Sequence, residues 1–128
     1  MAAATGTDAN ANKSREIISS IERQTISGST SALTFDEVVF IVRKIAGFEK
    51  SLIAGENFLN ISRLKIIEVN YQSILLAHEL MKKFRIKPRD AIHTACAINN
   101  DVKTIISDDS DFDAVKEIER INIKDFKV

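Results

Sequence analysis

The chain is organised around a turn between two predicted helices at residues 82–93, which read Lys82-Lys83-Phe84-Arg85-Ile86-Lys87-Pro88-Arg89-Asp90-Ala91-Ile92-His93. Pro88 suits the first turn of a helix, because proline lacks a backbone N–H and its φ angle is already close to the helical value. Asp90 then falls in that first turn, where the positive end of the helix dipole favours a carboxylate.

Two interpretations of this stretch are open. A carboxylate beside a basic run suits a metal-dependent nuclease, in which the carboxylate would hold the metal and the cations would hold phosphates. The alternative is an ordinary helix start with a favourable Asp and a solvated basic face. The rest of the chain has to decide between them.

The composition indicates one domain with a substantial core, since the chain has 128 residues, 45% hydrophobic and 28% charged. Lys plus Arg equals Asp plus Glu, at 18 each, so any attraction to nucleic acid has to come from local patches. Cys96 is the only cysteine, which excludes an internal disulfide. The sequence shows no membrane span and no secretory signal, and we expect a cytoplasmic protein.

The hydrophobic pattern alternates helices with short β-prone runs. Helices are predicted at residues 14–24, 34–46, 49–60, 71–84 and 88–99, and strands at 25–31, 64–69, 102–106 and 120–123. Residues 1–13 are small and polar, and we expect a weakly ordered or atypical segment there, followed by one domain over residues 14–128. Strands that alternate with helices predict an α/β fold with a parallel sheet covered on both faces.

Acidic side chains follow two of the predicted strands. Glu37 lies in the helix after the first strand, and Asp109 and Asp111 come directly after the strand that ends near Ser107. Ligands of open parallel sheets bind beyond the carboxyl ends of the strands, so Glu37, Asp90 and Asp109 are expected to meet there. Such a cluster is costly without a cation, and oxygen ligands at an open site suit Mg²⁺ or Mn²⁺.

Each of these residues also has a structural alternative. Thr34 and Glu37 have capping-box spacing, Asp109 can cap a turn, and the Ser31 and Ser107 hydroxyls can cap or bind a nearby acid. His93 lies one turn after Asp90 on an apolar helix, which favours a structural histidine.

Three blocks taken together resemble the signature blocks of PIN-domain proteins, in the manner of VapC-like toxins and their archaeal relatives. The blocks are TSALTFDEV at residues 30–38, KPRDAIH at 87–93 and IISDDSDFD at 105–113. The resemblance implies a three-layer α/β/α sandwich with a central parallel sheet, and a Mg²⁺- or Mn²⁺-dependent ribonuclease. It also implies a homodimer and an antitoxin protein as partner.

The same resemblance assigns roles by position. Glu37, Asp90 and Asp109 match the acids that surround the metal. The accessory group comprises Ser107, the hydroxyl of the last block, and Asp111, to which we add Ser31. Lys87 and Arg89 are the best candidates for phosphate contacts with an RNA substrate.

The front of the chain departs from the family pattern, which begins with an apolar strand that ends in Asp-x-Asn. Asp8-Ala9-Asn10 has these letters, but the preceding residues Ala2 to Thr7 are not apolar. We therefore expect an atypical or degraded first strand, with Asp8 as an additional metal ligand, and we expect residues 2–7 or a segment of a second copy to occupy its place in the sheet. The rival interpretation is a catalytically impaired PIN-like module that binds protein or RNA.

Overall fold

The structure, a computed structural model, describes residues 8–128. Five α-helices are described in this part of the chain: α1 (Asp8–Glu22), α2 (Leu33–Ala46), α3 (Phe48–Leu59), α4 (Tyr71–Phe84) and α5 (Pro88–Asn99). The strands are β1 (Ser29–Ser31), β2 (Lys65–Ile67), β3 (Thr104–Ile106) and β4 (Glu119–Ile121), and two short 3₁₀ helices are η1 (Ser110–Ala114) and η2 (Ile123–Asp125). Within residues 8–128, no helix is both long and apolar enough to cross a membrane.

The strands are parallel, as predicted, and they form two pairs. β1 pairs with β2, so that Ser31 lies opposite Ile67, and β3 pairs with β4, so that Ile106 lies opposite Ile121. A cavity of about 200 Å³ is lined by both β1 and β3, and by α1 and α5. Among residues 8–128 no strand joins the two pairs, and the segment 2–7 that we expected between them lies outside the described residues.

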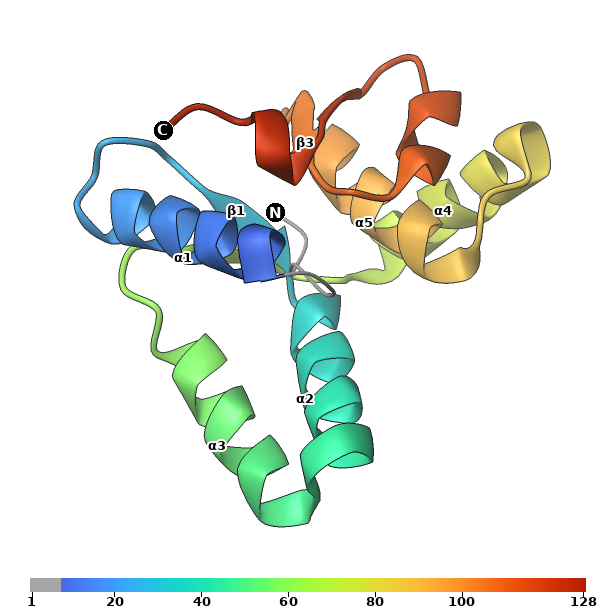
Figure 1. Cartoon of the computed structure of the whole chain (residues 1–128). Coiled ribbons are helices and arrows are strands. Elements are labelled where there is room, and N and C mark those ends of the chain that lie inside the picture. Colours follow the sequence, from blue (N-terminus) through green and yellow to red (C-terminus); the bar gives the residue numbers. More distant parts are fainter. Residues whose placement is uncertain (1–7) are drawn as a thin grey trace.

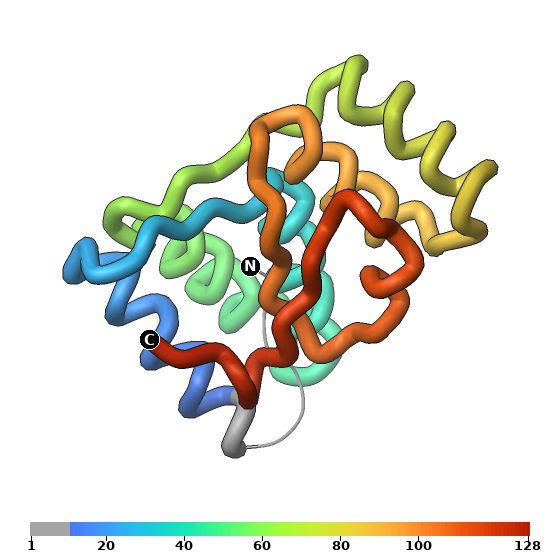
Figure 2. The backbone as a smooth tube through the Cα atoms, turned by 90° about the horizontal axis from the view of Figure 1, so that it is seen from above, coloured from blue at the N-terminus to red at the C-terminus, as the bar shows by residue number. Residues whose placement is uncertain are grey.

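The first helix begins earlier than predicted. The expected start was Ser14, whereas α1 already begins at Asp8, so Asp8-Ala9-Asn10 forms the first turn of a helix. Alanine is the strongest helix former, and Ala9 and Ala11 allow the helix to extend towards the N-terminus. α1 packs on η2 through Ile17, Ile21 and Ile123, and Figure 2 shows this helix beside the C-terminal segment.

The turn at residues 82–93 has the predicted form. α4 ends at Phe84, and Arg85 takes the left-handed conformation (φ 56°) while its N–H donates to the Met81 carbonyl. α5 then begins at Pro88, with Asp90 in its first turn. The inner faces of α4 and α5 pack with β3 and η1 into a core of alanines and larger apolar residues, among them Ile105 and Phe112.

The predicted capping box at the start of α2 does not form. Ala32 occupies the N-cap position in helical conformation without a side-chain hydrogen bond. Thr34 Oγ1 instead lies 2.7 Å from Thr30 Oγ1, and Glu37 contacts His93. Because the helix begins directly after β1, its first turn lies close to the strand. The Thr34 hydroxyl therefore bonds to Thr30 on the strand and does not cap the helix. The predicted stop at Gly47 is confirmed, since its φ of 94° ends α2.

α2 and α3 form a hairpin that projects from the rest of the molecule (Figure 1). They meet closely at Gly55, where an added Cβ would lie 3.0 Å from both Phe35 and Val39. Much of the outer apolar surface of this hairpin is exposed, including Phe40, which is 56% exposed, and Ile45, which is 80% exposed.

Candidate metal centre

Asp90 has one carboxylate oxygen enclosed within the fold. It lies in the first turn of α5, and its Oδ2 is buried without a hydrogen-bond partner in the described structure. Burial raises the pKa of Asp90, and the nearby charges of Asp109 and Asp111 raise it further. An ionised carboxylate with an unpartnered buried oxygen is unfavourable in the metal-free protein.

The loop after β3 holds the next two acids in place. The Ser107 hydroxyl accepts a hydrogen bond of 3.0 Å from the Asp109 backbone N–H. The Asp109 carboxylate accepts one of 2.9 Å from the Asp111 N–H and so caps η1. Ser107 therefore supports the loop that carries Asp109. Asp109 also has the capping role that we considered for it, and this role is compatible with binding a metal through its carboxylate.

Asp90, Asp109 and Asp111 converge. Each offers one carboxylate oxygen, and these three oxygens lie within 4.8 Å of one another. The residues fit a hard divalent cation, because such ions take oxygen ligands and a cation would satisfy the orphaned Asp90 Oδ2. Lys87 supplies part of the compensating charge, since its Nζ lies 3.8 Å from Asp111 Oδ2.

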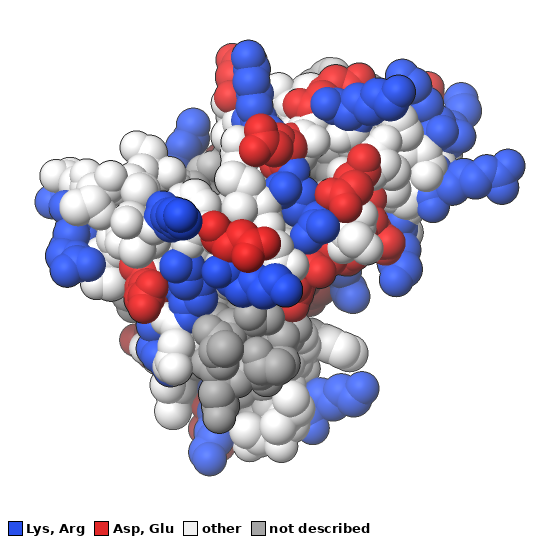
Figure 3. Space-filling view, turned by 45° about the horizontal axis from the view of Figure 1, so that its top comes forward, with Lys and Arg blue, Asp and Glu red and all other residues white. Residues whose placement is uncertain are grey.

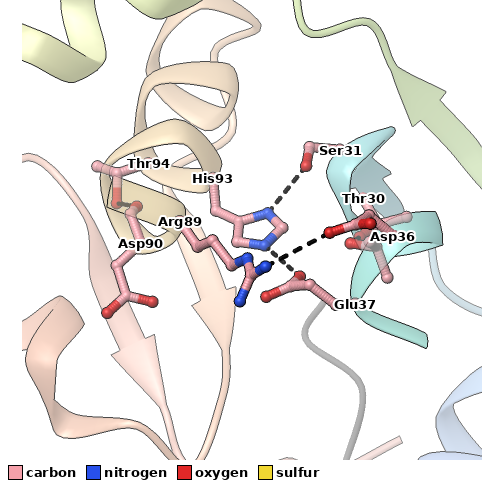
Figure 4. A network of polar contacts seen from close by, with 9 residues as sticks. Thr30, Ser31, Asp36, Glu37, Arg89, Asp90, His93 and Thr94 are labelled. Carbon is pink, nitrogen blue, oxygen red and sulfur yellow. Dashed lines mark hydrogen bonds and ion pairs between the residues drawn. The ribbon is translucent and has the colours of Figure 1, made fainter. Parts of the chain in front are cut away.

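Glu37 lies outside this three-acid group and is bound to a histidine. Its Oε1 lies 2.6 Å from His93 Nε2, and His93 Nδ1 lies 2.9 Å from Ser31 Oγ (Figure 4). The hydrogen bond to His93 is the main cause that lowers the pKa of Glu37, so the group is an ionised carboxylate at neutral pH. His93 is three residues after Asp90 on α5, and thus Glu37 is tied to the helix that carries the buried acid.

The remaining predicted residues are distributed as follows. Among the side chains that the structure describes, Ser31 contacts His93 and not an acid. Arg89 pairs with Asp36 at 3.5 Å, across the contact between α5 and α2. The side chain of Asp8 lies outside the described residues. Lys, Arg, Asp and Glu side chains intermingle on the face shown in Figure 3, in keeping with the zero net charge.

Sequence reasoning missed the contact of His93 with Glu37. The available signal was the spacing of three between Asp90 and His93, which places both side chains on one side of the same helix. The spacing could not show that Glu37 on α2 approaches that side of α5, because this contact depends on packing between residues far apart in the sequence.

The chain is similar to known proteins both in sequence pattern and in fold. The sequence model of the PIN domain matches residues 1–118. A VapBC2 complex of Rickettsia felis, bound to a DNA fragment from its promoter, contains a chain of 18% identity and a TM-score of 0.68, with 87% of this chain and 85% of that chain covered. DNA-bound VapBC of Salmonella typhimurium gives 17% identity and a TM-score of 0.67, over 91% and 95% of the two chains. A toxin–antitoxin complex of Klebsiella pneumoniae gives 19% identity and a TM-score of 0.56, over 84% and 90%.

No curated protein matches the chain. At these low identities the solved structures establish the fold alone, and they support the predicted α/β sandwich. The family follows from the sequence model, whose match extends from the first residue to beyond the β3 acids. On this evidence the chain belongs to the PIN domain family.

Proposed function

We propose that this PIN domain is a Mg²⁺- or Mn²⁺-dependent endoribonuclease and the toxin of a toxin–antitoxin pair. The observation that carries the proposal is the convergence of Asp90, Asp109 and Asp111 around the unpartnered Asp90 Oδ2. An acid group with a buried, unsatisfied oxygen destabilises the free protein, and a role in cation binding accounts for its presence. The PIN domain match agrees with it, since PIN domains are generally nucleases.

In this proposal Asp90, Asp109 and Asp111 hold the metal, and Glu37, which His93 ties to the helix of Asp90, is a further ligand from α2. Asp8 is a further ligand in the proposal, because the family match includes the segment that contains it. The metal would polarise a phosphoryl oxygen of RNA and lower the pKa of a bound water. Lys87 pairs with Asp111 and Arg89 pairs with Asp36, and in this proposal both cations contact phosphates of the substrate.

The partner in this proposal is an antitoxin protein, with a homodimer as the second association. The solved neighbours in the comparison are toxin–antitoxin complexes, which supports a partner of this kind. The α2–α3 hairpin adds an observation from this chain, since its exposed apolar residues form a surface of the type that protein partners cover. These residues are Phe40, Ile41, Ile45, Phe48, Leu52, Ile53 and Leu59.

A second candidate function is an impaired PIN module that binds RNA or protein without cleaving RNA. The observation that favours it is the position of Glu37, which is bound to His93 and lies outside the three-acid group. The two candidates differ in metal binding, because only the nuclease requires an acid group that takes Mn²⁺.

The experiment compares the wild-type chain, Asp90→Asn and the control Asp108→Asn. Asp108 is exposed and adjacent to Asp109 in sequence but lies outside the acid group, so the control removes the same charge nearby. We expect calorimetry to show Mn²⁺ binding, and gel assays to show Mn²⁺-dependent RNA cleavage, for the wild type and Asp108→Asn only. A wild-type chain that neither binds Mn²⁺ nor cleaves RNA would favour the impaired module, and equal Mn²⁺ binding by Asp90→Asn would refute the metal site.

A further inference from the structure

His93 connects three elements of the fold. Its ring comes from α5 and lies between Ser31, the last residue of β1, and Glu37, on the second turn of α2. The bonds measure 2.9 Å from Nδ1 to Ser31 Oγ and 2.6 Å from Nε2 to Glu37 Oε1. The side chain of His93 is 18% exposed, so water competes little for either nitrogen.

The charge of Glu37 determines where the ring protons lie. An ionised carboxylate only accepts hydrogen bonds, so Nε2 must carry a proton and donate it to Oε1. In the neutral ring Nδ1 is then an acceptor, and the Ser31 hydroxyl donates to it. Both ring nitrogens thus have a partner, and the imidazole is fixed in orientation from both sides.

This Ser–His–Glu chain is not arranged as a nucleophile triad. Ser31 is only 4% exposed, so its hydroxyl is not available to a substrate. In a serine hydrolase the acid contacts Nδ1 and the hydroxyl contacts Nε2, whereas here the two contacts are reversed. The chain instead ends at Glu37, which uses one of its two carboxylate oxygens for His93.

We propose that His93 is a positioning residue, which holds Glu37 in a fixed orientation and ties it to α5, the helix that carries Asp90, before metal or RNA binds. Glu37 has a long, flexible side chain, and fixing it in advance removes an ordering cost from cation binding. Since His93 and Asp90 share the first turns of α5, the same helix sets the positions of both acids. The inference rests on the proposed role of Glu37 at the metal.

A matched pair of substitutions separates the two contacts of the ring. A glutamine amide can occupy the place of Nε2, and an asparagine amide the place of Nδ1. His93→Gln therefore keeps a donor for Glu37, whereas His93→Asn keeps only the group that faces Ser31. If His93 acts through Glu37, the glutamine variant should retain function that the asparagine variant loses.

The affinity for Mn²⁺, measured by calorimetry without RNA, is the main readout. We expect His93→Asn to weaken it roughly tenfold, as for other groups that orient a ligand, and His93→Gln to stay within about twofold of wild type. In a Glu37→Ala background, His93→Asn should have no further effect. Equal losses in both His93 variants, or a full loss added to Glu37→Ala, would show a merely structural histidine and overturn the inference.

A second measurement needs no variant that might misfold. Nitrogen-15 NMR of the wild-type chain should find His93 Nε2 protonated, and an unprotonated Nε2 would overturn the inference. Failure of the proposed function gives a different result: wild type and Asp90→Asn would then bind Mn²⁺ equally weakly, and the inference about His93 would fail with it. If wild type binds Mn²⁺ and Asp90→Asn does not, the His93 variants test the inference alone.

Discussion

Lys87 Nζ lies 3.8 Å from Asp111 Oδ2, so a cation from the start of α5 sits at the outer side of the three-acid group. Both side chains are largely exposed, at 78% and 44%, and a pair of this kind contributes roughly 0–1 kcal/mol to stability. The pair therefore places a positive charge beside the acids at little energetic benefit to the fold.

Removing this charge should weaken RNA binding more than folding. For Lys87→Gln we expect a lower affinity for single-stranded RNA and a salt dependence shallower by about 0.7 in the log–log slope. The control is Lys82→Gln, which removes an exposed lysine that pairs with Glu79 on α4. Fluorescence anisotropy over a range of KCl concentrations measures both. Equal effects of the two substitutions would mean that Lys87 contributes only general surface charge.

Asp90→Asn should have opposite effects on stability without and with metal. The pKa of Asp90 is raised in the folded protein, so the folded state holds its proton more tightly than the unfolded chain. The ionised group therefore destabilises the metal-free protein, and that protein should gain stability as pH falls from neutral through the folded pKa towards the ordinary value of 3.8. Asparagine removes both the charge and this pH dependence.

Thermal melts at several pH values, with EDTA or with Mn²⁺, measure how the order of stability of the two proteins changes with metal. We expect Asp90→Asn to melt above wild type in EDTA at neutral pH and below it in saturating Mn²⁺. Mn²⁺ at about 100 times its Kd should stabilise the wild type by about 2.7 kcal/mol. An Asp90→Asn variant that melts below wild type in EDTA would show that the carboxylate supports the fold itself.

The front of the chain can be tested by truncation. We expect a chain that starts at Lys13 to lose stability, since it lacks the first turn of α1 and the segment proposed to fill the sheet. Asp8→Asn should keep the melting temperature and lower Mn²⁺-dependent cleavage. Circular dichroism melts and gel assays distinguish the two effects. If the truncated chain folds and cleaves RNA like wild type, Asp8 has no role at the metal.

The α2–α3 hairpin should mediate self-association. Ile45 is 80% exposed, and a charge at this position should weaken any contact that covers it while the interior stays unchanged. We expect the wild type to sediment as a dimer at micromolar concentration and Ile45→Glu to shift towards monomer, with unchanged Mn²⁺ binding. The control Lys50→Glu changes charge on an exposed position of α3. A wild-type chain that is monomeric at 100 micromolar (an order-of-magnitude limit for a weak dimer) would assign the surface to another partner.

The sequence predicted the fold best where local signals were strong. Pro88 with Asp90 defined the start of α5, Gly47 ended α2, and the run at residues 71–84 matched α4 in full. Local patterns misled at the start of α2, where the spacing of Thr34 and Glu37 suggested a capping box. There a contact across 56 residues, between Glu37 and His93, replaced the local one.

The same distinction holds at the candidate site. Asp90 and Asp109 could be placed together, because Asp109 follows β3 and Asp90 begins the helix that leads into it. Asp111 was expected only as an accessory acid, and Glu37, which was expected in the group, lies outside it. The contact of Glu37 with His93 could not be predicted, because it depends on how closely α2 packs against α5. The helical start of α1 was missed for a different reason, since alanine and asparagine in a polar segment give no hydrophobic periodicity to detect.

The division of the strands into two pairs has a consequence for how the molecule opens. Among residues 8–128 the pairs share no ladder with each other, and α5 is the helix that contacts β1, α2 and η1. If either strand pair separates from α5 with the helices packed on it, only one side of α5 is exposed. Exposing all of α5 requires both strand pairs to separate from it. Its central amides, around the fully buried Ala95, should therefore be the slowest in the protein to exchange with deuterium, while those of the α2–α3 hairpin exchange first.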